Sequence, residues 1–175
     1  LFKQKIISFK IKNKIIYGLH KIEKEIANKK FEFNKKYEDI HMNIEKRLFQ
    51  IIGEEAGFVH TGRSRNDQVI TDFKIWIKSA TKEINVLLDN LIKNTLKLAE
   101  KNVYTIMPGF THLKNAQAIS FAHYLMAYIE MFNRDKNRFK NNLNSLDENP
   151  LGVAALTGTS FNIDRNYTTK KLGFK

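Results

Sequence analysis

The residues whose types and spacing suggest chemistry lie in one short string from His60 to Gln68, which reads His-Thr-Gly-Arg-Ser-Arg-Asn-Asp-Gln. The string holds two guanidinium groups, two hydroxyls, two amides and a carboxylate, and it precedes the longest helical pattern of the chain. Free backbone N–H groups and the helix dipole both favour negative charge where a loop turns into a helix. The string therefore predicts a site for an anionic ligand.

A purely structural role is the alternative for part of this string. Ser64 and Asp67 have the spacing of a capping box, in which the first residue caps a helix and the fourth reaches back to it. Capping accounts for these two side chains but leaves Arg63, Arg65 and Asn66 without a role. We therefore predict a binding site whose scaffold includes the cap.

A second candidate lies farther along the chain, where Thr111 and His112 follow Pro108 and Gly109. We expect a turn at the Pro-Gly pair and a helix that begins near Ala116. A histidine on a loop beside a helix start is free to face a ligand and to exchange a proton. The residues alone leave open whether His112 is catalytic or only caps the helix.

A third candidate is the pair His41 and Glu45, which are four residues apart and share one helix face. The pair could handle a proton or hold a metal. A surface or interface hydrogen bond is the favoured interpretation, because no third ligand lies nearby. The chain has no cysteine, which excludes disulfides, thiolate metal sites and a cysteine nucleophile.

Few and long helices are expected to position these residues, because the 175 residues include only 2 prolines and 8 glycines. Apolar residues recur at helical spacing through most of the chain. The predicted fold class is therefore all-α. The expected helices cover residues 1–30 (as one or two helices), 38–52, 66–102 and 116–146. Asn149 and Pro150 end the last of them, and a loop of small residues follows from 151 to 160.

The helix expected at 66–102 separates the two candidate sites. At a rise of about 1.5 Å per residue it spans about 50–55 Å, so Arg65 and His112 lie at its opposite ends. The following helix carries the chain back and brings Thr159 near the first string. Apolar residues on several sides of the long helix, Trp76 among them, favour burial in a bundle or between subunits. Either the chain has two separate sites or symmetry-related chains complete each other's sites, and we favour the second.

The formal net charge of +12 raises nucleic acid, an anionic membrane or an acidic substrate as partners. The lysines, however, are scattered along every expected helix, and no arginine-rich run or aromatic-glycine motif of a nucleic-acid module is present. The longest apolar stretch, residues 118–132, contains polar side chains and does not have the character of a membrane span. We therefore predict neither a nucleic-acid partner nor a membrane partner.

Five strings of the chain recur together in one known family, and they are residues 38–45, 60–69, 107–113, 149–155 and 163–165. In order and spacing, over about residues 15–165, they resemble the argininosuccinate lyase family of the fumarase/aspartase superfamily. The Gly-Arg-Ser-Arg-Asn-Asp part is specific to that family.

This resemblance implies part of an all-α bundle of long helices, which forms a homotetramer with each active site built from three subunits. It implies β-elimination of argininosuccinate to arginine and fumarate, the last step of arginine biosynthesis, in the cytoplasm and without a metal or organic cofactor. Carried over residue by residue, it implies that the substrate is bound by Ser64, Arg65, Asn66 and Thr111. It implies that His112 transfers or orients a proton. Removing a proton beside a carboxylate builds negative charge, which donors of these types stabilise.

The chain departs from the family's pattern in two ways. Lys114, Ala118 and Asn162 stand where Gln, Pro and Pro are usual, and the cation of Lys114 would oppose formation of an imidazolium at His112. The family's mobile loop, a Gly-Ser-Ser-x-Met-Pro-x-Lys-x-Asn string with the serine base, is also absent, as is its N-terminal substrate-binding segment.

The chain also begins at Leu1 rather than methionine, so we expect a fragment that is inactive alone. We expect residues 1–65 to be the truncated end of an N-terminal helical region. Residues 66–175 would be the truncated start of the central helical-bundle domain.

Two other functions remain as alternatives. A non-catalytic homologue, like the lens crystallins of this family, would keep the fold without the activity, and the retained strings around Arg65 and His112 argue against it. A basic helical protein that binds nucleic acid would show salt-sensitive binding to unrelated DNA, and the scattered lysines argue against that.

Overall fold

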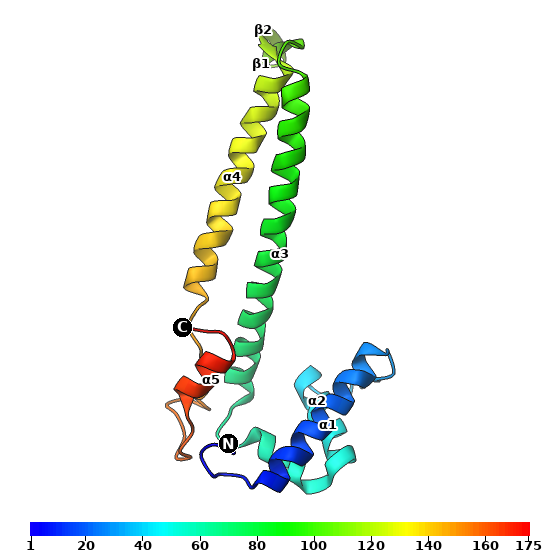
Figure 1. The fold of residues 1–175 in the computed structure, drawn as a ribbon, viewed down its shortest axis with the longest axis vertical. Helices are drawn as coiled ribbons and strands as arrows, with labels where there is room; N and C mark the ends of the chain where they lie inside the picture. Colours follow the sequence, from blue (N-terminus) through cyan, green and yellow to red (C-terminus); the bar gives the residue numbers. More distant parts are fainter. The chain divides into compact units, whose positions relative to one another are not determined.

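A computed structural model describes residues 1–175, and Figure 1 shows a chain built mainly of helices. This confirms the predicted all-α class, to which the structure adds a single two-stranded hairpin. None of the helices combines the length and the apolar character that crossing a membrane requires. The elements in chain order are α1 (Phe9–Ala27), α2 (Ile40–Ile52), the 3-10 helix η1 (Gly53–His60), α3 (Arg65–Lys101), β1 (Ile106–Thr111), β2 (Lys114–Ser120), α4 (Phe121–Ser145) and α5 (Arg165–Lys171).

The chain divides into two units. The first unit comprises Leu1–Thr71 and Asn149–Gly173, and the second comprises Asp72–Glu148 and Phe174–Lys175. The long helix α3 begins in the first unit and continues through the second.

Local caps set the starts of the first two helices. The Ser8 hydroxyl accepts a hydrogen bond from the N–H of Ile11, so α1 begins at Phe9 and not at residue 1 as expected. The Asp39 carboxylate accepts one from the N–H of Met42 at 2.6 Å, which starts α2 within two residues of the predicted position. Both helices therefore have the predicted order and spacing.

The apolar core of the first unit lies where α1, α2 and η1 meet. Ile22 and Leu48 are fully buried there, and Ala56 packs with them. Gly18 permits this close packing, because a Cβ atom on it would overlap Leu48 Cδ1 and lie 3.2 Å from Ile52 Cγ2. The glycine in the middle of α1 is thus explained by packing against α2.

We expect Gly18→Ala to lower the free energy of unfolding by about 1–3 kcal/mol, since the added methyl group overpacks the contact with Leu48. The substitution gains helix propensity worth about 1 kcal/mol, so a protein without this contact would become more stable. Gly57→Ala is the matched control, because a Cβ atom there meets nothing within 4 Å. Urea unfolding measures both variants, and equal stabilisation by the two would contradict the packing.

In the second unit, α3 and α4 run side by side and are joined by the β1–β2 hairpin (Figure 1). The helix predicted at 66–102 is confirmed within one residue at each end, as 37 continuous residues. At about 1.5 Å per residue α3 is about 55 Å long. Lys78 pairs with Asp147 at 2.7 Å, and Lys136 of α4 pairs with Asp89 of α3.

The helix expected to begin near Ala116 begins only at Phe121, so this prediction was wrong. The Ser120 hydroxyl accepts a hydrogen bond from the N–H of His123 at 3.1 Å and caps α4 at that point. The preceding residues 114–120 form β2, which pairs antiparallel with β1. The Ala and Gln residues of this segment favour helix locally, and pairing with β1 overrides that preference.

The turn of the hairpin is also not where the sequence placed it. Pro108 and Gly109 lie within β1, at an irregularity of the strand register, and the turn is made by His112 and Leu113. Both turn residues have positive φ, +48° and +63°, as the tight hairpin turn that suits twisted strands requires. Gly109 has another role, because a Cβ atom on it would lie 2.7 Å from the Gln117 carbonyl oxygen.

Candidate functional site

The first candidate string forms the N-terminal end of α3. The Ser64 hydroxyl accepts a hydrogen bond from the Asn66 N–H at 3.2 Å, and the Asp67 carboxylate accepts one from the Ser64 N–H at 3.0 Å. These bonds confirm the capping role that the sequence predicted for Ser64 and Asp67, with the Ser64 hydroxyl bonded to the N–H of Asn66 and not to that of Asp67. They fix the backbone of the turn that carries Arg65 and Asn66.

Thr159 returns to this turn, as predicted, and the rest of the segment 149–163 accompanies it. The other Asp67 carboxylate oxygen accepts hydrogen bonds from the N–H groups of Gly152 and Ala154, at 3.1 and 2.8 Å. Gly62, with φ of +66°, has Thr159 and Ile163 so close that a Cβ atom would lie 3.5 and 3.2 Å from their methyl carbons. The string and the small-residue segment are therefore packed and hydrogen-bonded together.

Both arginines of the string bind one carboxylate on α2. Arg65 makes a two-pronged contact with Glu45, with Nη1–Oε1 and Nη2–Oε2 distances of 3.1 and 2.8 Å. Arg63 Nη2 lies 2.7 Å from Glu45 Oε1. Arg65 Nε also lies 3.3 Å from a carboxylate oxygen of Asp39. Planar guanidinium groups favour such paired contacts, so the two side chains are held in defined orientations.

The sequence interpretation missed this acidic partner. The spacing suggested only that Glu45 shares a helix face with His41. Glu45 bonds to Arg63 and Arg65, and His41 Nδ1 lies 3.1 Å from the side-chain amide nitrogen of Gln68. The carboxylates were visible as the acidic string 38–45, but nothing in their spacing indicated a contact with the second string. No group of three or more histidine and acidic side chains could hold a metal ion.

The network changes the proton affinity of its members. Burial acts to raise the pKa of Glu45, but the hydrogen bonds and charge of Arg65, with His60 and Arg63, outweigh it, and the pKa lies below its ordinary value. The hydrogen bond to Glu45 raises the pKa of Arg65. Burial lowers the pKa of Arg63, against the attraction of Glu45. The carboxylate is thus stabilised as an anion between two cations.

A pH dependence of stability follows. Because the pKa of Glu45 is depressed on folding, its contribution is fully present above the ordinary glutamate pKa of about 4.3 and is lost as pH falls through the lower folded-state value. We expect the difference in Tm between the wild type and Glu45→Gln to be constant near neutral pH and to shrink below about pH 4. Thermal unfolding at stepped pH measures this. A difference that stays constant down to about pH 2 would contradict the ion-pair network.

The predicted substrate-binding residues differ in their access to solvent. Asn66 is exposed, whereas Ser64 and Arg65 are half-buried. The Arg65 side chain keeps 19% of its surface exposed after binding Glu45 and Asp39. The arrangement presents the exposed Asn66 amide at a helix start, which suits an anionic ligand, beside an Arg65 guanidinium whose nitrogens are engaged by Glu45, Asp39 and Gln68.

Thr111 and His112 lie at the tip of the hairpin in the second unit, and both are exposed. His112 is therefore a turn residue and not the helix-capping group that the sequence left open. One candidate string precedes α3 and the other follows it, so 37 helical residues lie between them in the chain. The long helix predicted between the two strings is confirmed.

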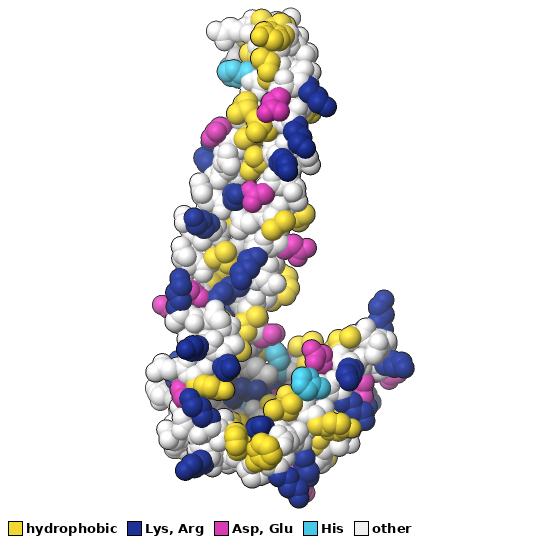
Figure 2. Space-filling model, viewed as in Figure 1, with side chains coloured by type: hydrophobic (Ala, Val, Ile, Leu, Met, Phe, Trp, Pro, Cys, Tyr) yellow, Lys and Arg dark blue, Asp and Glu magenta, His cyan; other side chains and the backbone are white.

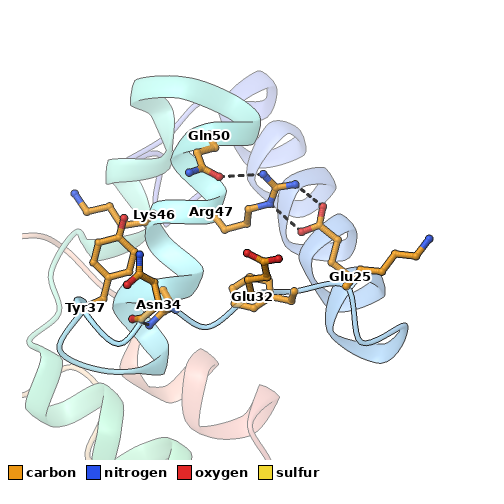
Figure 3. Close-up of a pocket in the computed structure, with 10 residues that line it drawn as sticks. Glu25, Glu32, Asn34, Tyr37, Lys46, Arg47 and Gln50 are labelled. Carbon is orange, nitrogen blue, oxygen red and sulfur yellow. Dashed lines mark hydrogen bonds and ion pairs between the residues drawn. The ribbon is translucent and has the colours of Figure 1, made fainter.

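A hollow of about 370 Å³ lies between α1, the connector 28–39 and α2 (Figure 3), and no sequence pattern predicted it. Arg47 crosses it and donates to both carboxylate oxygens of Glu25, at 2.8 and 2.7 Å, and to Gln50 at 3.0 Å. The buried Asn43 side chain bonds to the backbone of Asn34 and Asp39. The Arg47 contacts therefore join α2 to α1, and the Asn43 contacts hold the connector in place.

Comparison with known proteins gives consistent results. The family model described as lyase matches residues 2–175. The chain is 82% identical, over all its residues, to an argininosuccinate lyase from Pelagibacter ubique (strain HTCC1062), of which it covers 38%. It is 54% identical over 97% of its length to an argininosuccinate lyase from Chelativorans sp. (strain BNC1), of which it covers 36%. The chain thus spans less than two-fifths of the length of these relatives.

Solved structures share the fold. An EDDS lyase in complex with formate superposes with a TM-score of 0.86 at 26% identity, covering 99% of this chain and 34% of that one. A fumarate lyase:delta crystallin from Brucella melitensis superposes with a TM-score of 0.79 at 18% identity, covering 99% of this chain and 43% of that one. At 18% identity, the second match shows a shared fold and nothing further. These matches confirm the resemblance and the fold class that the sequence motifs predicted.

Proposed function

The chain belongs to the lyase family, and from this premise we propose that it is part of a longer argininosuccinate lyase. The observation that carries the proposal is the 82% identity, over the whole chain, to the argininosuccinate lyase of Pelagibacter ubique. The reaction is β-elimination, which releases arginine and fumarate and completes arginine biosynthesis. No metal or organic cofactor is expected to take part.

In this reaction a proton leaves the carbon beside a carboxylate, the bond from the neighbouring carbon to nitrogen breaks, and that nitrogen leaves with the arginine product. Negative charge grows on the carboxylate while the proton departs, so fixed donors lower the barrier. We assign Ser64, Arg65, Asn66 and Thr111 to substrate binding. His112 transfers or orients the proton. The capping box and the Glu45 contacts support this assignment, because they hold the first three residues in a fixed geometry.

We further propose that the protein is a homotetramer whose subunits complete each other's sites. The position of Ser64 and His112 at opposite ends of α3 supports this, since one site needs both. Figure 2 shows apolar side chains at the surface along α3 and α4. Trp76, Val86 and Leu87 are about 60% exposed in the single chain, which suits burial against other subunits.

In the cell, we place the protein in the cytoplasm, with argininosuccinate, arginine and fumarate as its small-molecule partners. In the whole protein, residues 1–65 would end an N-terminal helical region and residues 66–175 would begin the central bundle domain.

The proposal predicts that the whole protein releases fumarate from argininosuccinate and that residues 1–175 alone do not. The chain spans only 38% of its relative, and a site built from several segments needs all of them. Ultraviolet absorbance of fumarate measures both proteins under the same conditions. Turnover by residues 1–175 alone would contradict the shared site, and a whole protein that folds without turnover would favour a non-catalytic homologue.

A further inference from the structure

Asp67 is the most completely buried charged group of the first unit, with 3% of its surface exposed. Its two carboxylate oxygens accept three backbone hydrogen bonds, from Ser64 at 3.0 Å, Gly152 at 3.1 Å and Ala154 at 2.8 Å. A buried carboxylate is tolerated only when such donors satisfy it. Asp67 therefore joins the start of α3 to a distant segment, since Gly152 and Ala154 lie 85 and 87 residues after it in the chain.

The segment on the far side is shaped to meet this carboxylate. Gly152 and Ala154 both have positive φ, +102° and +53°, and the N–H groups of both point at the same oxygen. A positive φ is uncommon for alanine and persists only where the surroundings hold it. Backbone N–H groups arranged in this way form a concave anion site, which is here filled by the protein's own side chain.

A helix cap alone does not explain this arrangement. The cap uses one oxygen of Asp67, which accepts from Ser64, and Ser64 in turn accepts from Asn66. The second oxygen makes both of its bonds to the segment that continues to Thr159, whose methyl group packs against Gly62. The carboxylate thus connects the turn that carries Asn66 to the segment that packs behind it.

We propose that Asp67 is a positioning residue, which acts through the backbone to hold the Ser64–Asn66 turn and the Gly152–Thr159 segment in one geometry that binds substrate. The inference rests on the proposed function, since it takes Ser64–Asn66 as the substrate-binding turn. Asp67 itself does not touch the substrate. Loss of its charge loosens the turn and weakens substrate binding, while the proton-transfer group at His112 stays unchanged.

Asp67→Asn in the whole protein tests this, because it keeps the size of the side chain and replaces one acceptor oxygen with an NH₂ group that cannot accept. The KM for argininosuccinate is expected to rise about tenfold or more, with kcat changed by less than about threefold. Amide hydrogen exchange at Gly152 and Ala154 is expected to accelerate. The matched control is Leu48→Ala, which destabilises the same unit through its apolar core without removing a bond to Gly152 or Ala154. It is expected to leave KM unchanged and to accelerate exchange at these two amides no more than at the other amides of the unit.

An Asp67→Asn protein with unaltered KM and unaltered exchange at Gly152 and Ala154 would overturn the inference. Equal rises of KM in both variants would also overturn it, since the effect would then come from general destabilisation. A wild type without turnover rejects the proposed function, whereas the exchange measurement still decides the role of Asp67. If Asp67→Asn does not fold, exchange in the wild type decides. Added arginine and fumarate must then slow the Gly152 and Ala154 amides, and unchanged rates overturn the inference.

Discussion

Replacing His112 by asparagine in the whole protein is expected to lower kcat by about 10²- to 10⁴-fold, the usual contribution of a positioned proton-transfer group, with little change in KM. Asparagine suits this position because residue 112 has a φ of +48°, which asparagine adopts more readily than most residues. The hairpin turn therefore survives while the imidazole is lost. Steady-state kinetics of fumarate release measures the effect.

His123→Asn is the matched control for this prediction. His123 is also exposed and lies in the same unit, in the first turn of α4, but it belongs to neither candidate string. The control is expected to keep kcat within about threefold of the wild type. A kcat that is equal in His112→Asn and the wild type would remove His112 from the chemistry.

Replacing Glu45 by glutamine is expected to lower kcat/KM about 100-fold, because Arg65 then loses the two-pronged contact that orients it beside Asn66. The same change leaves Arg63 with less compensation for its burial. The buried Arg63 Nε already has no hydrogen-bond partner within the chain. The Nη2 atom of the same guanidinium donates to Glu45 Oε1 at 2.7 Å. Stability is expected to fall by about 1–3 kcal/mol. Kinetics and urea unfolding measure the two effects.

Glu25→Gln controls for the general loss of an arginine–glutamate pair, since Glu25 makes the same two-pronged contact with Arg47 (Figure 3). That pair contains no residue assigned to the reaction, so kcat/KM is expected to stay near the wild-type value. If Glu45→Gln behaved like Glu25→Gln in the activity assay, the network around Glu45 would be structural and would not orient the substrate-binding turn.

The sequence by itself determined the long helices and the cap of α3. The apolar spacing predicted residues 66–102, and the helix runs from Arg65 to Lys101. The capping bonds of Ser64 and Asp67 join residues two or three apart. Such features depend on local propensity and spacing, which a single chain displays directly. The family strings likewise identified the lyase family, because each is a short contiguous motif that can be recognised in the sequence alone.

The hairpin was decided by tertiary structure. Residues 114–120 contain Ala and Gln, which favour helix, and a Pro-Gly pair that commonly makes a turn lies just before them. Their strand form depends on backbone pairing with β1, and the turn falls at His112 and Leu113 instead. Strand propensity depends on what a strand pairs with, so local sequence could not reveal it.

The inner construction of the candidate site was decided in the same way. The string predicted that Arg63 and Arg65 have a role, but not that Glu45 holds both of them across 18 and 20 residues of sequence. Nor did it predict that Asp67, recognised as a cap, also binds Gly152 and Ala154. Local spacing fixes a cap because its donor and acceptor lie within one helical turn. Contacts between distant segments form only when packing brings those segments together, and that is why the structure alone disclosed them.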